Sequence, residues 1–169
     1  MTPLLLMAAS LAATPRGSST LRDSDGVRHT ADRAFDGLMK TGWAEGDAGY
    51  GAGSWLELSL DRKTTLNSVS LWPGDLSQGA RSHREHSRPK LIRVFVDGQQ
   101  IGEPIRLQDK MARVDLPLGG IEGRTVRIVV DEVWKCALRL TDACGGRKVW
   151  ECGLDDVYSW KHQPFMPVE

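Results

Sequence analysis

Short stretches in which apolar and polar residues alternate are the feature that most limits how this chain of 169 residues can fold. In residues 55–60, Leu56, Leu58 and Leu60 fall on one face of an extended chain. Residues 125–134 carry a second apolar stripe with the same period of two. Long apolar stripes with a helical period are missing, and glycine is abundant, at 18 residues. The chain is therefore predicted to be all-β and built from short strands.

Turn-forming residues divide the chain into about eight such strands. Besides the two stretches above, strands are expected at residues 17–21, 66–72, 90–96, 100–107, 112–116 and 149–160, the last as one strand or a strand pair. Turns are expected at Asp61-Arg62-Lys63, at the Asp97-Gly98 hairpin signal and at Pro117-Leu118-Gly119-Gly120. Residues 30–35 read as a single helical turn with Thr30 as its N-cap. This spacing predicts an antiparallel β-sandwich or jelly roll.

The charge balance limits the classes of partner. The 22 acidic and 22 basic residues cancel, so the chain has no global field that would attract nucleic acid or an anionic membrane. The length suits one domain with a real core, which we place at residues 14–161, followed by an irregular tail at 162–169.

The apolar run at residues 3–13 is too short for a transmembrane segment, which needs about 20 residues. Its length fits the core of a signal peptide, and Ser10 and Ala12 are small residues at the positions that a signal peptidase reads. We expect residues 1–13 to be a signal peptide and the protein to be secreted or periplasmic, at the cell envelope. No Lys or Arg precedes Leu4, so the alternatives are a frayed N-terminal helix or a wrongly assigned start.

All three cysteines, Cys136, Cys144 and Cys152, lie late in the chain and form no CxxC pair, so a structural zinc site is not expected. In an oxidising compartment two of them could pair. A bridge between Cys136 and Cys152 would close the loop at 137–151. One alternative is a bridge between Cys144 and either of the other two cysteines. The other is that all three are buried thiols without a bridge.

Residues 34–43 form a turn that carries an acidic side chain and a hydroxyl before a tryptophan. Asp36 and Thr41 bracket a glycine-containing turn, and Ca²⁺ is bound by carboxylate, hydroxyl and carbonyl oxygens of this kind. From spacing alone, the favoured interpretation is an Asx-turn in which Asp36 caps backbone amides.

The run Ala34-Phe35-Asp36-Gly37, then Thr41-Gly42-Trp43, Ser54-Trp55-Leu56-Glu57-Leu58 and a closing Leu154-Asp155-Asp156-Val157 resembles the discoidin or F5/8 type C group. That group belongs to the galactose-binding-like superfamily, which includes family 32-type carbohydrate-binding modules. The similarity covers most of residues 18–160. It implies a galactose-binding-like jelly-roll sandwich with a structural Ca²⁺ near one end.

Matched residue by residue, the resemblance implies that the ion would be held by the carbonyl of Ala34, the side chains of Asp36 and Thr41, and a carboxylate from Asp156. Many members have Glu at that last position, where this chain has the shorter Asp. Some members lack the metal.

The resemblance also implies that ligands bind at loops on one end of the sandwich, here at residues 44–53, 72–88 and 134–146. Residues 74–88 are polar and aperiodic, as expected for a binding loop or a disordered segment. An aromatic ring and directional polar groups are what a sugar requires. The residues expected to bind the ligand are Tyr50, Trp72, Asp75, His83, His86, Arg88 and Trp134. For each of them the alternative is a structural role, at the edge of the core for Trp72 and Trp134, or in a solvated loop for the histidines.

No catalytic constellation is found, so an enzyme is not expected. His83 and His86 lack the i, i+4 spacing of the helical zinc motif, and no Ser-His-Asp order, phosphate loop or nucleotide fingerprint is present. Asp155 and Asp156 are adjacent and would point to opposite faces of a strand. The expected function is non-catalytic glycan binding, and the alternative is a protein–protein or lipid-surface adhesion or adaptor domain on the same fold.

Overall fold

The computed structural model describes residues 12–23, 25–135, 137–141 and 147–151. The strands are β1 (Ala13–Gly17), β2 (Trp55–Leu71), β3 (Arg88–Val96), β4 (Gln99–Arg106), β5 (Val114–Trp134), β6 (Ala137–Thr141) and β7 (Arg147–Glu151). A 3₁₀ helix, η1 (Ala31–Ala34), and a short α-helix, α1 (Ala80–Glu85), complete the described elements.

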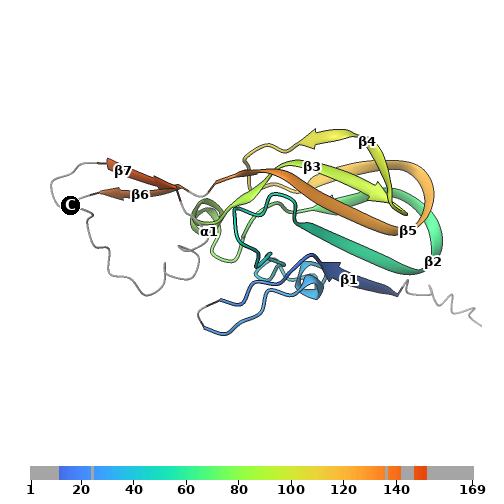
Figure 1. Ribbon diagram of the computed structural model, residues 1–169, viewed down its shortest axis with the longest axis horizontal. Coiled ribbons are helices and arrows are strands. Elements are labelled where there is room, and N and C mark those ends of the chain that lie inside the picture. Colours follow the sequence, from blue (N-terminus) through green and yellow to red (C-terminus); the bar gives the residue numbers. More distant parts are fainter. Residues whose placement is uncertain (1–11, 24, 136, 142–146, 152–169) are drawn as a thin grey trace, which may run out of the picture.

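Every strand pairing is antiparallel. Five strands form one sheet in the order β1-β2-β5-β3-β4, and β6 pairs with β7 in a second, two-stranded sheet. Figure 1 shows the long strands β2 and β5 curling round together at one end of the five-stranded sheet, while α1 lies at the other end of that sheet, on the side of β6 and β7. The prediction of an antiparallel all-β sandwich is confirmed.

β2 and β5 are longer than predicted because two expected turns lie inside strands. Residues 61–63 belong to β2, where the register with β5 shifts between Ser59 and Thr64. Residues 117–120 belong to β5, where Gly119 and Gly120 have positive φ values of 70° and 74°. Glycine adopts these angles at little cost, so the strand bends where a turn was expected to end it. Both predicted turns are wrong.

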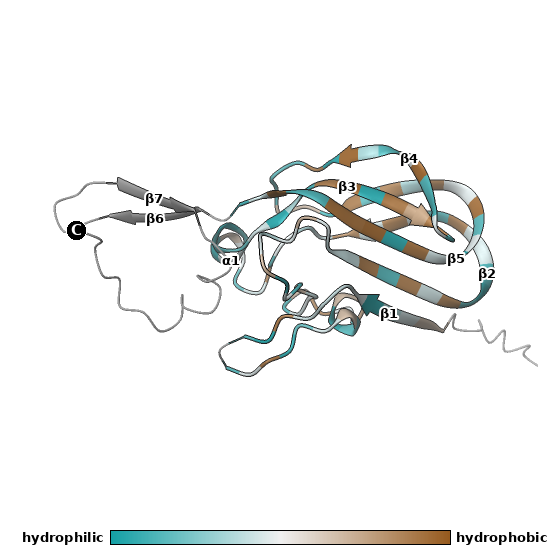
Figure 2. Cartoon of the chain, in the orientation of Figure 1, coloured by the Kyte–Doolittle hydropathy of each residue, from teal (hydrophilic) through white to brown (hydrophobic). Residues whose placement is uncertain are grey.

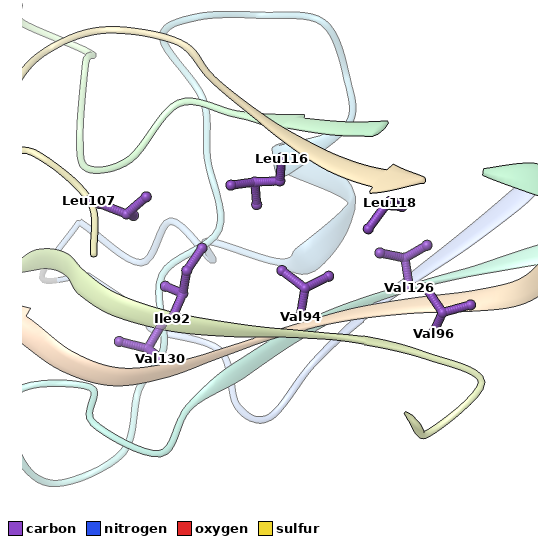
Figure 3. Close-up of a cluster of buried hydrophobic side chains, with 8 residues drawn as sticks. All are labelled: Ile92, Val94, Val96, Leu107, Leu116, Leu118, Val126 and Val130. Atoms are coloured by element: carbon purple, nitrogen blue, oxygen red, sulfur yellow. The ribbon is translucent and has the colours of Figure 1, made fainter. Parts of the chain in front are cut away.

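The core lies between the two layers that this bending creates. Leu116 and Leu118, from the first half of β5, face Val126 and Val130 from its second half, together with residues of β3 (Figure 3). Ile92 of β3 is fully buried. Hydrophobic and hydrophilic residues alternate along the strands (Figure 2), so one face of each packs inward.

The β3–β4 hairpin forms where it was predicted. Asp97 and Gly98 have φ values of 48° and 82°, as required by a tight turn that matches the twist of the strands. The Asp97 carboxylate also accepts hydrogen bonds from the backbone N–H groups of Arg124 and Thr125, at 2.9 and 2.8 Å. The turn is thereby attached to β5.

Three local predictions differ from the structure. The first strand was expected at residues 17–21, but β1 spans Ala13–Gly17, and beyond it the N–H of Ser18 donates to the carbonyl of Trp55 at the start of β2, where the pairing of the two strands ends. The segment 134–146 was expected to be a loop and contains β6 (Ala137–Thr141). The helical turn at 30–35 is confirmed as η1, but Thr30 makes no side-chain capping bond. The predicted signal peptide, the cysteines and Asp156 lie largely or wholly outside the described residues.

Candidate functional site

The segment 74–88 is ordered by a small helix and an internal hydrogen-bond network. The N–H of Ser77 donates to the Asp75 carboxylate at 2.7 Å, and the N–H of Gln78 donates to Ser82 Oγ at 2.9 Å. The Ser82 hydroxyl lies 3.1 Å from the carbonyl oxygen of Asp75, and Ser82 is only 2 % exposed. Of the two interpretations of this segment, the disordered one is therefore wrong, and the binding loop stays a prediction. Short-range polar bonds hold it, and apolar periodicity could not have indicated them.

An ion pair joins the beginning and the end of segment 74–88. His86 Nδ1 lies 3.0 Å from the Asp75 carboxylate and 3.0 Å from the carbonyl oxygen of Ser82. Burial alone would raise the pKa of Asp75, but the hydrogen bonds from His86 and Ser77 lower it to about 2. Burial also opposes the charge on His86, and the Asp75 carboxylate outweighs it, so the pKa of His86 is raised. The pair is charged at mildly acidic pH, below the ordinary pKa of 6.5 for histidine.

Two of the predicted ligand residues are buried. Arg88, 7 % exposed, donates to the Asp109 carboxylate through Nε and Nη2, each at 2.6 Å. His83 is 5 % exposed, and burial together with the charge of Arg88 lowers the pKa of its imidazole. A Cβ atom at Gly74 would lie 3.0 Å from the His83 ring and 3.3 Å from the Cβ of Arg88, so these residues form one packed unit. Their geometry favours a structural role.

Asp109 is a site residue that was missed in the sequence. It lies on the connection between β4 and β5, 21 residues from Arg88, and no local pattern marks it. Its pairing with Arg88 attaches that connection to the start of β3. The ion pair between Arg88 and Asp109 therefore depends on the tertiary fold, which brings the two residues together.

The three aromatic candidates differ in how open their rings are. Trp72 is 46 % exposed. The Lys90 ammonium lies 5.1 Å from the centre of the Trp134 ring, and the Lys135 ammonium lies 4.5 Å from the centre of the Tyr50 ring. Cations at these distances interact favourably with an aromatic face. Trp72 therefore offers the most accessible ring of the three for stacking.

The segments that carry most of the predicted ligand residues, namely α1, the start of β3 and the end of β5, lie at one end of the sandwich (Figure 1). Trp134 is the cross-strand partner of Arg88, and its buried indole N–H has no hydrogen-bond partner among the described residues. Tyr50 comes from another loop, which joins the end of β5 through the N–H of Gly53 and the carbonyl of Val130 at 2.7 Å.

The turn at residues 34–43 is held by its own side chains. Asp36 accepts a hydrogen bond from the N–H of Leu38 at 2.8 Å and another from the Thr41 hydroxyl at 2.6 Å. These two bonds lower the pKa of the exposed Asp36 carboxyl. Asp36 and Thr41 thus provide two adjacent oxygens of the kind that Ca²⁺ prefers, but they also complete an Asx-turn without a metal.

The described residues contain no group of three or more acidic, histidine or cysteine side chains that could hold a metal. The expected fourth ligand, Asp156, lies outside them. Calcium binding by Ala34, Asp36, Thr41 and Asp156 therefore stays a prediction.

Trp43 connects this turn to the end of β1. Its indole N–H donates to the carbonyl of Ser19 at 2.9 Å, and its ring packs on Gly17, where a Cβ atom would overlap the indole. We call the turn at residues 34–43 the corner turn. Its attachment to β1 through Trp43 requires the absence of a side chain at position 17.

Gly17→Ala is expected to lower the free energy of unfolding by about 1–3 kcal/mol, because the added methyl group must displace the Trp43 ring. Urea denaturation followed by Trp fluorescence measures the change. Gly42→Ala is the matched control, because a Cβ atom there meets nothing within 4 Å. Equal stability of the two variants would show that Trp43 does not pack on Gly17.

The Asp75–His86 pair predicts a pH-dependent contribution to stability. The folded pKa of His86 is raised. The stability that His86 contributes is therefore fully present below the ordinary pKa of 6.5 and is lost as pH rises through the folded pKa. The folded pKa of Asp75 is about 2, so its part is complete above 3.8 and is lost as pH falls towards 2. Wild type should exceed His86→Gln in stability by about 1 kcal/mol near pH 5–6, and by less at pH 9.

Chemical denaturation of both proteins at several pH values tests this prediction. His29→Gln is the control, because its carboxylate contact, with Asp23, is longer at 3.4 Å and lies outside this segment. A difference between wild type and His86→Gln that does not change from pH 6 to pH 9 would contradict the role of the charge.

Among the residues that the structure describes, no helix is long and apolar enough to cross a membrane.

The bent antiparallel sandwich has the galactose-binding-like fold of its solved neighbours, and the matching family model confirms the F5/8 type C resemblance seen in the sequence. The chain belongs to the NAD glycohydrolase translocation F5/8 type C domain family, whose model matches residues 9–158. No curated protein matches the sequence.

Solved structures with the same fold include carbohydrate-binding modules. The module CpGH89CBM32-5 of Clostridium perfringens, in complex with GalNAc-β-1,3-galactose, is similar with a TM-score of 0.56 and 17% identity over 71% of this chain and 84% of that one. The family 32 module of C. perfringens NanJ, in complex with galactose, has a TM-score of 0.53 and 14% identity over 71% of this chain and 82% of that one. A pectin-binding carbohydrate-binding module has a TM-score of 0.51 and 18% identity over 72% of this chain and 78% of that one. At these identities the likeness establishes the fold.

Proposed function

We propose that this domain is a non-catalytic module that binds carbohydrate at the α1 end of the sandwich. The observation that carries the proposal is the exposed ring of Trp72, three residues before the Asp75–His86 pair. An aromatic ring stacks on the C–H face of a sugar, while charged and amide groups beside it bond the hydroxyls. The solved neighbours in complex with galactose and GalNAc-β-1,3-galactose support this class of ligand.

Within this proposal, six of the seven predicted residues divide into two groups, and Tyr50, whose ring contacts Lys135, is assigned to neither. Trp72, Asp75 and His86 would contact the sugar directly. Arg88, His83 and Trp134 would hold the loops in place, because Arg88 and His83 are buried and Trp134 contacts Lys90. We also propose an extracellular or envelope location, which the family description, a translocation domain, supports.

Trp72→Ala is expected to weaken glycan binding by about 10- to 100-fold, which corresponds to the loss of one stacked ring. A glycan array that includes galactose- and GalNAc-terminated sugars, followed by calorimetry on the best ligand, measures the effect with calcium and with chelator. Leu38→Ala is the control, because this exposed apolar side chain lies on the corner turn. Binding to no glycan, or unchanged binding by Trp72→Ala, would refute the proposal.

An adhesion or adaptor role towards a protein or lipid surface is the second candidate. Phe35, Leu38 and Met39 on the corner turn are 44, 62 and 49 % exposed, and the hydrogen bonds of Asp36 hold that turn in shape. Large apolar side chains that are displayed in this way favour contact with a partner surface. Co-purification of a partner that is lost on Leu38→Ala, together with an empty glycan array, would favour this role.

A further inference from the structure

A small hollow lies on the connection between β4 and β5, close to the proposed glycan site. Its volume is about 220 Å³, and residues from Ile105 to Val114 line it. Leu107, Ile105 and Val114 belong to the core cluster or pack against it, so the floor of the hollow is apolar. The Arg88–Asp109 ion pair holds this connection at the α1 end.

Three cations line the hollow: Arg106, Lys110 and Arg113. Arg106 and Arg113 are 59 % and 56 % exposed in their side chains, and Lys110 has no ion pair among the described residues. Arg106 has only a long contact of 3.8 Å with Glu132. Positive charge thus gathers here although the chain as a whole is neutral.

The carboxylates near the hollow already pair with cationic side chains. Asp109 accepts two hydrogen bonds from Arg88, Glu132 lies 2.8 Å from the Lys90 ammonium, and Asp115 accepts from Arg113 at 2.8 Å. An anionic group that enters the hollow would therefore meet cations whose charge is not fully balanced. A guanidinium group binds carboxylate or sulfate through charge-assisted hydrogen bonds, which are stronger than those between neutral groups.

The end of β2, which leads directly to Trp72, pairs with the start of β5 at the hollow. Leu71 of β2 is the cross-strand partner of Val114, which lines the hollow. Arg113 also donates through Nη2 to the hydroxyl of Ser70 at 2.8 Å, two residues before Trp72. Ser70 and Trp72 alternate with Leu71 along the extended chain, so they share the outward face. The end of β2 that leads to Trp72 thus runs beside the segment that carries Arg113.

We propose that the glycan bound by this domain is acidic, with a carboxylate or sulfate group placed among Arg106, Lys110 and Arg113. A neighbouring sugar ring would stack on Trp72. This inference rests on the proposed function, because it names the ligand class of that same site. It predicts that a neutral form of the same polymer binds more weakly and that affinity for the acidic form falls as salt rises.

Calorimetry on the full chain with polygalacturonate and with its methyl ester tests the inference, because the two polymers differ in charge on one backbone. A sulfated galactan and its desulfated form separate sulfate from carboxylate. We expect the acidic polymer to bind at least about tenfold more tightly than its neutral form. Arg106→Gln with Lys110→Gln should remove most of that preference and leave binding of the neutral form unchanged. Lys40→Gln, an exposed cation of the corner turn, is the matched control.

The outcomes separate the two proposals. Binding of none of the four polymers, together with an empty glycan array, refutes the proposed function and this inference with it. Equal binding of acidic and neutral forms, or an acidic preference that the double variant keeps, overturns the inference and leaves glycan binding standing. A preference that the double variant loses and Lys40→Gln retains supports the acidic ligand at this hollow.

Discussion

Leu116→Ala is expected to lower the free energy of unfolding by about 3–4 kcal/mol. Leu116 is 2 % exposed and lies in the first half of β5, opposite the second half of the same strand and β3 (Figure 3). Truncation removes buried methyl groups and leaves a cavity between the two layers, which close-packed neighbours fill only in part. Urea denaturation followed by circular dichroism measures the loss.

Leu38→Ala is the matched control for this substitution. It removes the same atoms from a side chain that is 62 % exposed on the corner turn, so a change within about 0.5 kcal/mol is expected. The two variants differ only in burial. A loss below about 1 kcal/mol for Leu116→Ala would contradict the packing of the two halves of β5 over one core.

Asp109→Ala is expected to cost about 2–3 kcal/mol of stability. The substitution leaves the Arg88 guanidinium buried without its carboxylate, and an unpaired buried charge is strongly destabilising. The expected loss lies below the full range for a buried pair, because the Asp109 side chain is 39 % exposed and water can reach the site. The α1 end of the sandwich should loosen most, since this pair attaches the β4–β5 connection to β3.

A double-mutant cycle distinguishes the ion pair from general damage to the loop. Arg88→Met alone leaves Asp109 partly exposed to water, and adding Asp109→Ala to it should cost little more. Asp115→Ala is the control, because its pair with Arg113 is exposed on both sides and should change stability by less than about 1 kcal/mol. Additive losses from Arg88→Met and Asp109→Ala would refute a direct coupling between these residues.

Much of the fold could be predicted because its signals are local. Alternation in residues 55–60 predicts a strand, and Asp97-Gly98 predicts a hairpin from the backbone angles that these two residues tolerate. The turn at Asp36 and Thr41 is held by bonds that span at most five residues. Such features need only neighbouring residues, and the sequence specifies those directly.

Other features depended on contacts between distant parts of the chain. The polar segment 74–88 gives no sign that His83 and Arg88 would be buried, because residue type alone indicates exposure for both. Their burial follows from Asp109, which sheet closure brings to Arg88. The predicted turns at 61–63 and 117–120 failed for a similar reason, since pairing between β2 and β5 shifts register at both places and resumes beyond them, at Thr64 with Gly123 and at Ser68 with Pro117.

The sequence by itself therefore determined the all-β class, the hairpin, the corner turn and the loops where recognition was expected. Only the tertiary structure decided which of the predicted ligand residues are available. It buried Arg88 and His83, left Trp72 exposed, and gathered three cations around a hollow on the β4–β5 connection. The physical reason is that strand and turn preferences act between neighbours along the chain, whereas burial and charge pairing are set by which distant segments the closed sandwich brings together.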